Sequence, residues 1–283
     1  MPESLESLKY FETFFRTLSD PHQKGSVEIH PTARVEKSAV LGKGVKVGPL
    51  SYVGPHANIA DDVLIGSNVM IDGRVTIGPR TQLWSFVTLG VIPQHVRFKG
   101  EESTLAIGSD NIFREYTNIS LGTEIGHNKT VIGSRNVFSA FSHVGHDGII
   151  GNDVFFSNGI NLGGHIEIQD GVVFGSMVGV HQFCRIGKWS HLESGSMVSQ
   201  DVVPFCMVRG DRATVSGLNI EGLKKAGISG TRFDNIKKMF DFLFKENLTL
   251  EESFDMIEKE IPTSEDKLSF LEFVRLSERG ICR

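Results

Sequence analysis

The sequence is poor in the features that mark secreted, membrane-spanning and nucleic-acid-binding proteins. Its three cysteines, Cys184, Cys206 and Cys282, are few and far apart, so they form neither a zinc motif nor a disulfide framework. No stretch of about 18 apolar residues is available to cross a bilayer. The N-terminus lacks the basic and apolar regions of a signal peptide, and the net charge of −5 disfavours nucleic acid. We therefore expect a cytoplasmic protein with no integral membrane segment and no nucleic-acid partner.

What the sequence has in place of these features is a period of six residues. An aliphatic residue or Phe recurs at every sixth position over residues 29–89, 107–125 and, after a one-residue shift, 132–198. Neither the helical period of 3.6 nor the strand period of 2 produces this pattern. Hexapeptide repeats are typical of a parallel β-helix. We expect three hexads, or 18 residues, in each triangular coil, with the repeated residue pointing inward.

The period also divides the chain into parts. The β-helix is predicted over 29–204, and residues 91–106 and 120–131 interrupt the period. Each interruption is expected to be a loop, and 91–106 fits a tolerated surface insertion or a binding loop.

Outside 29–204 the hydrophobic spacing is helical. Residues 205–283 are predicted to form a C-terminal α-helical domain, because apolar residues recur at helical spacing between 236 and 243. The N-terminal segment 1–28 is predicted to carry a short amphipathic helix. Its apolar stripe consists of Leu5, Leu8, Phe11, Phe15 and Leu18.

The 18-residue coil brings several histidines together. Stacking places Gly164 directly above His146 and His165 above Asp147, at about 4.8 Å per coil. His143 and His181 fall at the same edge of the prism.

This cluster suits acyl transfer from a thioester to a hydroxyl or amine. A neutral imidazole at His146 is able to act as general base, and Asp147 is able to orient it. The Gly164 amide is able to hold an oxyanion. The acids and histidines lack a closed ligand set, so we predict no metal.

Several motifs give the chain a specific resemblance. HVGHD, LGGH, VHQFCRIG and NIEGLKKAG follow one another in that order. Over roughly 27–283 the chain resembles the UDP-N-acetylglucosamine 3-O-acyltransferases of lipid A biosynthesis. The resemblance implies a left-handed β-helix and a homotrimer with sites between subunits. It also implies transfer of an (R)-3-hydroxyacyl chain from acyl carrier protein, a co-substrate, to a UDP-sugar without any cofactor.

The resemblance assigns roles to individual residues. It implies His146 as general base, Asp147 as its partner and Gly164 as oxyanion donor. The substrate-binding residues that it implies are His143, His165, His181, Gln182, Gln94, His95, Arg97, Asn219, Glu221 and Lys225. His191 and Ser194 belong to the wall that measures the length of the acyl chain.

The sequence departs from the family pattern in four places, one of which spans two residues. His95 stands where the family has an Asp that contacts the sugar, and Ser120 stands where it usually has a His. Lys225 and Ala226 replace two consecutive arginines that clamp the diphosphate, and Ser194 occupies the variable position of the acyl ruler. All four concern substrate recognition, and none concerns the base.

Two other functions remain compatible with the sequence. One is a paralogous acyltransferase that accepts a different nucleotide sugar or acyl chain, which the departures at His95, Ser120 and Ala226 favour. The other is a non-catalytic protein that binds a ligand or partner, which the intact set of His146, Asp147 and Gly164 disfavours. The sugar, the acyl length and the choice between ester and amide stay open.

Overall fold

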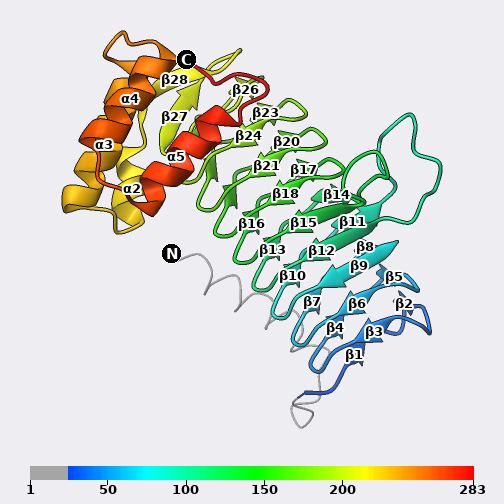
Figure 1. Ribbon diagram of the computed structural model, residues 1–283. Helices are drawn as coiled ribbons and strands as arrows, with labels where there is room; N and C mark the ends of the chain where they lie inside the picture. The colour runs from blue at the N-terminus through cyan, green and yellow to red at the C-terminus, as the bar shows by residue number, and fades with distance from the viewer. Residues whose placement is uncertain (1–24) are drawn as a thin grey trace.

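Residues 25–283 are described by the computed structural model, and most of them form a three-sided parallel β-helix (Figure 1). The predicted β-helix is therefore confirmed. The predicted N-terminal helix, with its stripe from Leu5 to Leu18, falls on residues outside the described range.

Three sheets form the sides of the prism, and each coil contributes one short strand to each sheet. Sheet A contains β1 (Glu28–Ile29), β4 (Lys46–Val47), β7 (Leu64–Ile65), β10 (Gln82–Leu83), β13 (Ile112–Phe113), β16 (Val137–Phe138), β19 (Phe155–Phe156), β22 (Val173–Phe174), β25 (His191–Leu192), β27 (Cys206–Arg209) and β28 (Thr214–Leu218). Sheet B contains β2 (Arg34–Val35), β5 (Tyr52–Val53), β8 (Met70–Ile71), β11 (Thr88–Val91), β14 (Asn118–Ser120), β17 (His143–Val144), β20 (Asn161–Leu162), β23 (Gly179–Val180) and β26 (Met197–Val198). Sheet C contains β3 (Val40–Leu41), β6 (Asn58–Ile59), β9 (Arg74–Ile77), β12 (Thr104–Ile107), β15 (Lys129–Ile132), β18 (Ile149–Ile150), β21 (Glu167–Ile168) and β24 (Arg185–Ile186).

The core of the prism consists of the residues that recur every sixth position. From Val47 onward they are buried, with the exception of Ile125. Identical positions stack along the axis: the rings of Phe113, Phe138, Phe156 and Phe174 lie parallel with centroids 4.3 to 4.8 Å apart. Ile29 is 45% exposed because it lies in the first coil, where no further strand covers it within the described residues.

The two interruptions differ in extent from the sequence prediction. Residues 104–107 form β12 and rejoin the coil, so the first loop covers only 92–103 (Figure 1). In the second, Asn118 pairs with His143, which is 25 residues later, whereas an uninterrupted coil has 18. The chain therefore leaves the prism over 121–128. Ile125 lies in this loop and is 49% exposed, so its assignment to the core was wrong.

The C-terminal region begins with strands rather than helices. β27 pairs in parallel with β25, and β28 returns antiparallel to β27, so both strands extend sheet A beyond residue 204. The helices α2 (Ile220–Lys225), α3 (Gly230–Phe244), α4 (Leu250–Glu260) and α5 (Glu265–Arg275) follow and lie at the upper end of the prism (Figure 1). The side chains of Asn219, Thr249 and Ser264 cap the first turns of α2, α4 and α5.

Candidate active site

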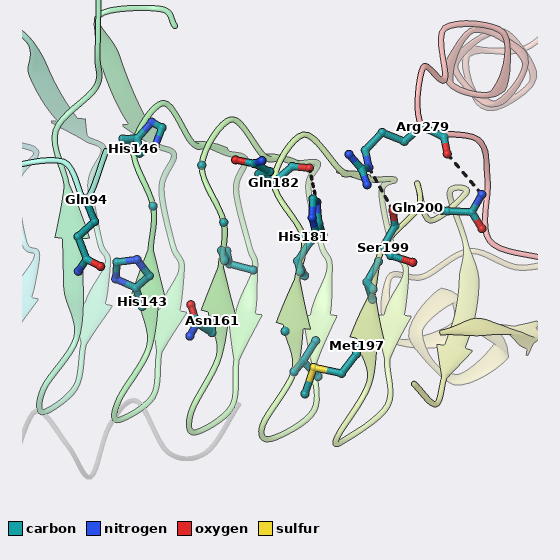
Figure 2. A pocket seen from close by; sticks show the side chains of 18 of the residues that line it. Gln94, His143, His146, Asn161, His181, Gln182, Met197, Ser199, Gln200 and Arg279 are labelled. Atoms are coloured by element: carbon teal, nitrogen blue, oxygen red, sulfur yellow. Dashed lines mark hydrogen bonds between the residues drawn. The ribbon is translucent and has the colours of Figure 1, made fainter. Parts of the chain in front are cut away.

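An open cleft of about 1320 Å³ runs along the edge of sheet B, from the coil of β17 to the coil of β26. Its side chains come from successive coils, with one end at Gln94 and the other at Arg279 (Figure 2). Seven of the predicted site residues line this cleft: Gln94, His95, His143, His146, Gly164, His181 and Gln182.

His146 and Asp147 form a buried pair at the turn that follows β17. Nδ1 of His146 lies 2.8 Å from Oδ2 of Asp147, and the two residues are only 7% and 1% exposed. A carboxylate oxygen only accepts, so Nδ1 carries the proton and Nε2 keeps its lone pair. The structure therefore fixes the tautomer that a general base requires.

Asp147 is held by a network from the loop 121–128. The Thr123 hydroxyl donates to Oδ2 at 2.6 Å, and the amides of Thr123 and His127 donate to Oδ1 at 3.0 and 2.9 Å. Burial by itself would raise the pKa of Asp147, but the hydrogen bonds from His146 and this loop hold the pKa well below its usual range. Asp147 is thus a fixed carboxylate that stabilises a positive charge on His146.

Gly164 lies directly against the imidazole, as the stacking of coils predicts. A Cβ atom at this position would stand 2.6 Å from Cε1 and 2.7 Å from Nε2 of His146. Within residues 25–283, the amide of Gly164 donates no hydrogen bond to the protein, whereas its neighbour Gly163 donates to Val180. A free donor beside the base is suited to hold a developing oxyanion.

Two further histidines of the cleft have fixed tautomers. Nδ1 of His143 lies 3.0 Å from Oδ1 of Asn118, whose amide nitrogen donates to Thr88. Nδ1 of His181 lies 3.0 Å from the carbonyl oxygen of Gln182. Both Nδ1 atoms therefore donate, and both Nε2 atoms are acceptors. Burial, and then the proximity of His146, lower the pKa of His143, which favours its neutral form.

His95 and His165 contact the imidazole of His146 edge to face from two sides, with ring centroids 5.0 and 4.9 Å away. His165 also stacks on Phe183 at 4.6 Å, and it is not among the residues that line the cleft. Ligand atoms of His146, Asp147 and His165 lie within 4.8 Å of one another. Both oxygens of Asp147 already accept hydrogen bonds, which favours an orienting role over metal ligation.

Comparisons with known proteins agree with this geometry. Residues 56–90 match the model of the bacterial transferase hexapeptide, and residues 201–282 match that of UDP N-acetylglucosamine O-acyltransferase, domain 2. The acyl-[acyl-carrier-protein]–UDP-N-acetylglucosamine O-acyltransferase of Anaeromyxobacter sp. strain K is 38% identical over 90% of this chain and 99% of its own. That of Aliarcobacter butzleri is 47% identical over 77% of this chain and 84% of its own. The chain belongs to the UDP-N-acetylglucosamine O-acyltransferase family.

A solved structure supports the same assignment. The UDP-N-acetylglucosamine acyltransferase of Bacteroides fragilis 9343 superposes with a TM-score of 0.87 at 32% identity, over 90% of this chain and 99% of that one. The chain is thus an acyltransferase with a β-helix and a C-terminal helical part. No helix among residues 25–283 is long and apolar enough to cross a membrane.

Three other predicted site residues, His191, Ser194 and Lys225, do not line this cleft and lie in or next to β25 and in α2. His191 is in β25, and Ser194 follows it, accepting a hydrogen bond from the Ser176 amide at 3.1 Å. Burial lowers the pKa of His191. The nearby charge of Glu193 raises this pKa, and the charge of Lys225 lowers it. Lys225, in α2, is therefore close enough to His191 for its charge to act on the imidazole.

Three more predicted site residues do not line the cleft: Asn219, Glu221 and Arg97. Asn219 is 3% exposed, accepts from the Gly222 amide and donates to the carbonyl of Trp189, so its side chain is engaged within the fold. Glu221 is exposed and pairs with Lys224 at 3.3 Å. Arg97 is exposed in the loop 92–103, where its amide donates to Nδ1 of His95.

The sequence analysis missed several residues that the structure places at the site. Thr123 and the backbone of His127 hold Asp147, and the Thr130 hydroxyl accepts from its amide at 3.0 Å. Asn161 lies in the cleft one coil above His143. The register of 18 residues would have identified Asn161, but the extra loop residues disrupt that register for Thr123.

Proposed function

We propose that this acyltransferase moves an (R)-3-hydroxyacyl chain from acyl carrier protein to the 3-position of UDP-N-acetylglucosamine, the first step of lipid A biosynthesis. The observation that carries the proposal is the placement of His146 between the carboxylate of Asp147 and the free amide of Gly164. This is the arrangement that direct attack on a thioester requires.

The reaction follows from the three groups. Nε2 of His146 removes the proton of the sugar hydroxyl as its oxygen attacks the thioester carbonyl. The Gly164 amide donates to the resulting oxyanion, and Asp147 stabilises the imidazolium. Collapse of the intermediate breaks the carbon–sulfur bond, and the imidazolium returns its proton to the leaving thiolate. The proton balance closes without a cofactor.

We propose further that the working form is a cytoplasmic homotrimer. In a closed trimer one face of each copy meets a different face of the next copy. The cleft of one copy would then meet His191, Ser194 and Lys225 of a neighbour, because within one chain these three residues do not line the cleft. The three free, buried cysteines suit a reducing compartment.

The test is transfer from a panel of acyl-carrier thioesters to a panel of UDP-sugars, followed by mass spectrometry. The proposal expects the highest kcat/KM for an (R)-3-hydroxyacyl donor with UDP-N-acetylglucosamine. Binding of a UDP-sugar without transfer from any donor would instead support a non-catalytic binding protein.

One observation favours a second candidate, a paralogue that prefers a different nucleotide sugar. His95 contacts the base His146 at the point where the resemblance expects an Asp that accepts from the sugar. The imidazole of His95 offers the acceptor group of the sugar a different set of hydrogen-bond donors and acceptors from the carboxylate of an Asp. The same panel distinguishes this candidate, because a modified sugar would then give the highest kcat/KM.

A further inference from the structure

The end of the cleft that lies farthest from His146 is closed by the C-terminal strap, residues 276–283. Arg279 extends from this strap toward Ser199 and Gln200, at the opposite end from Gln94 (Figure 2). We propose that Arg279 binds the phosphate of the acyl donor's phosphopantetheine arm. This inference rests on the proposed function, because it names the donor chemistry that the same cleft recognises.

The length of the cleft matches that arm. His146, Gly164, Gln182 and Gln200 occupy one register position in four successive coils. Three steps between coils span about 14 Å. The chain of pantetheine from thioester carbon to phosphorus, at the spacing of an extended backbone, reaches about 16 Å. A donor whose thioester lies beside the imidazole of His146 thus places its phosphate near Gln200 and Arg279, three coils away.

The strap holds Arg279 in a fixed position. Asp201 donates through its amide to the carbonyl of Gly280 at 2.9 Å and accepts from the Cys282 amide at 2.8 Å. The carboxylate of Asp201 accepts from the Ser277 hydroxyl at 2.8 Å. Arg279 donates from Nε to the carbonyl of Ser199 at 3.1 Å. The backbone on both sides of Arg279 is tied to the last coil, so its guanidinium is preorganised.

The charges at this end favour an anion. Arg212 also lines it, and the acidic residues nearby are Asp211, which lines the cleft, and Asp201, whose carboxylate interacts with the charge of Arg279. Within residues 25–283, Arg279 forms no ion pair with a carboxylate, whereas Arg275, four residues earlier, pairs with Glu258. Nε of Arg279 donates to Ser199, and the guanidinium also interacts with the thiol of Cys184. Its remaining donors suit the forked geometry of a phosphate.

The other phosphate among the substrates is the diphosphate of the nucleotide sugar, and the geometry disfavours it. The sugar carbon that carries the acceptor group is separated from the nearer phosphorus by only four bonds, or about 5 Å. With the acceptor at His146, that phosphate lies within about one coil of the base. Arg279 is three coils away.

The experiment compares two donors, an (R)-3-hydroxyacyl thioester of 4′-phosphopantetheine and the same thioester of pantetheine. Wild type should prefer the phosphorylated donor by about 10–100-fold in kcat/KM, the range of charge-assisted hydrogen bonds. Arg279→Gln should remove this preference and leave the pantetheine thioester within about twofold of wild type. Arg279→Lys should keep part of the preference, and the matched control Arg275→Gln should keep all of it.

Three results would overturn the proposal. An equal loss with both donors in Arg279→Gln would make Arg279 a purely structural residue. A raised KM for the UDP-sugar, with unchanged donor kinetics, would assign the residue to the nucleotide. A wild type that does not distinguish the donors has no phosphate contact at all.

A binding measurement keeps the inference separate from the proposed function. Calorimetry with free 4′-phosphopantetheine should give a Kd that rises about tenfold or more in Arg279→Gln, with no change in Arg275→Gln. If wild type transfers acyl groups from neither donor, the proposed function fails, and this titration still decides whether Arg279 binds the phosphate. An unchanged Kd would refute the binding role.

Discussion

The cleft on sheet B and the residue group on sheet A differ in how complete they are within one chain. In the cleft, His146 contacts both Asp147 and Gly164, so the proposed base, orienting acid and oxyanion donor all come from one chain. His191 in β25, Ser194 in the turn after it and Lys225 in α2 do not line this cleft, and the charge of Lys225 acts on His191. In the proposed homotrimer, one chain would supply the chemistry, whereas two neighbouring chains would share the recognition of substrate.

The largest effect is expected at the centre of the cleft. His146→Ala should lower kcat by about 10²–10⁴-fold, because the general base is lost. The thermal midpoint should change by no more than about 2 °C, since the side chain makes one buried hydrogen bond. His56→Ala, in an exposed turn of a remote coil, is the control. Activity within threefold of wild type would remove His146 from the mechanism.

Mixed trimers test whether the two groups cooperate across subunits. His146→Ala disables the cleft, and Lys225→Glu reverses a charge in the sheet A group. When the two variants are unfolded and reassembled together, about a quarter of the sites combine an intact cleft with an intact sheet A group. Activity should therefore rise to roughly that fraction of wild type. No recovery in a mixture shown to be trimeric would mean that each site belongs to one chain.

Ser194 tests the recognition side of the comparison. Ser194→Met adds methylenes to the wall that the resemblance assigns to the acyl ruler, and overpacking costs about 1–3 kcal/mol. The longest accepted chain should lose about 5–100-fold in kcat/KM, while shorter chains gain relative to it. The measurement is a profile of kcat/KM against donor length. An unchanged profile would show that Ser194 does not contact the acyl chain.

The smallest effect is expected at His95, which contacts His146 and stands where the resemblance expects an Asp that binds the sugar. If the imidazole disfavours the usual sugar, wild-type kcat/KM for UDP-N-acetylglucosamine is low, and His95→Asp raises it by about tenfold. In the alternative case, Arg97 and Lys224 supply the contacts to the substrate that the departures from the family pattern remove, and wild type keeps its activity with UDP-N-acetylglucosamine. A wild-type value of about 10⁴ M⁻¹s⁻¹ or above, lowered by the substitution, would refute this preference.

The two regions also differ in how far the sequence predicts them. An exact repeat converts distance along the chain into distance in space, so the period of six was sufficient to place Gly164 on His146 and His181 one coil above Gly163. Irregular insertions carry no such rule. The support of Asp147 by Thr123 and the exposure of Ile125 therefore escaped prediction. So did the strands β27 and β28, because their short apolar runs are not distinctive in sequence.

The stacking of nearly identical coils determines where local unfolding of the protein begins. In a solenoid each repeat is stabilised mainly by its two neighbours, so unfolding begins at the ends. The strand β17, which carries His143 and precedes His146, is paired on one side with β14 and on the other with β20. Amide hydrogen exchange should therefore be slowest in the middle coils and fastest in the first coil. The imidazole of His146, the proposed base, is therefore remote from fraying at the first coil, and its geometry should persist while the first coil unfolds locally.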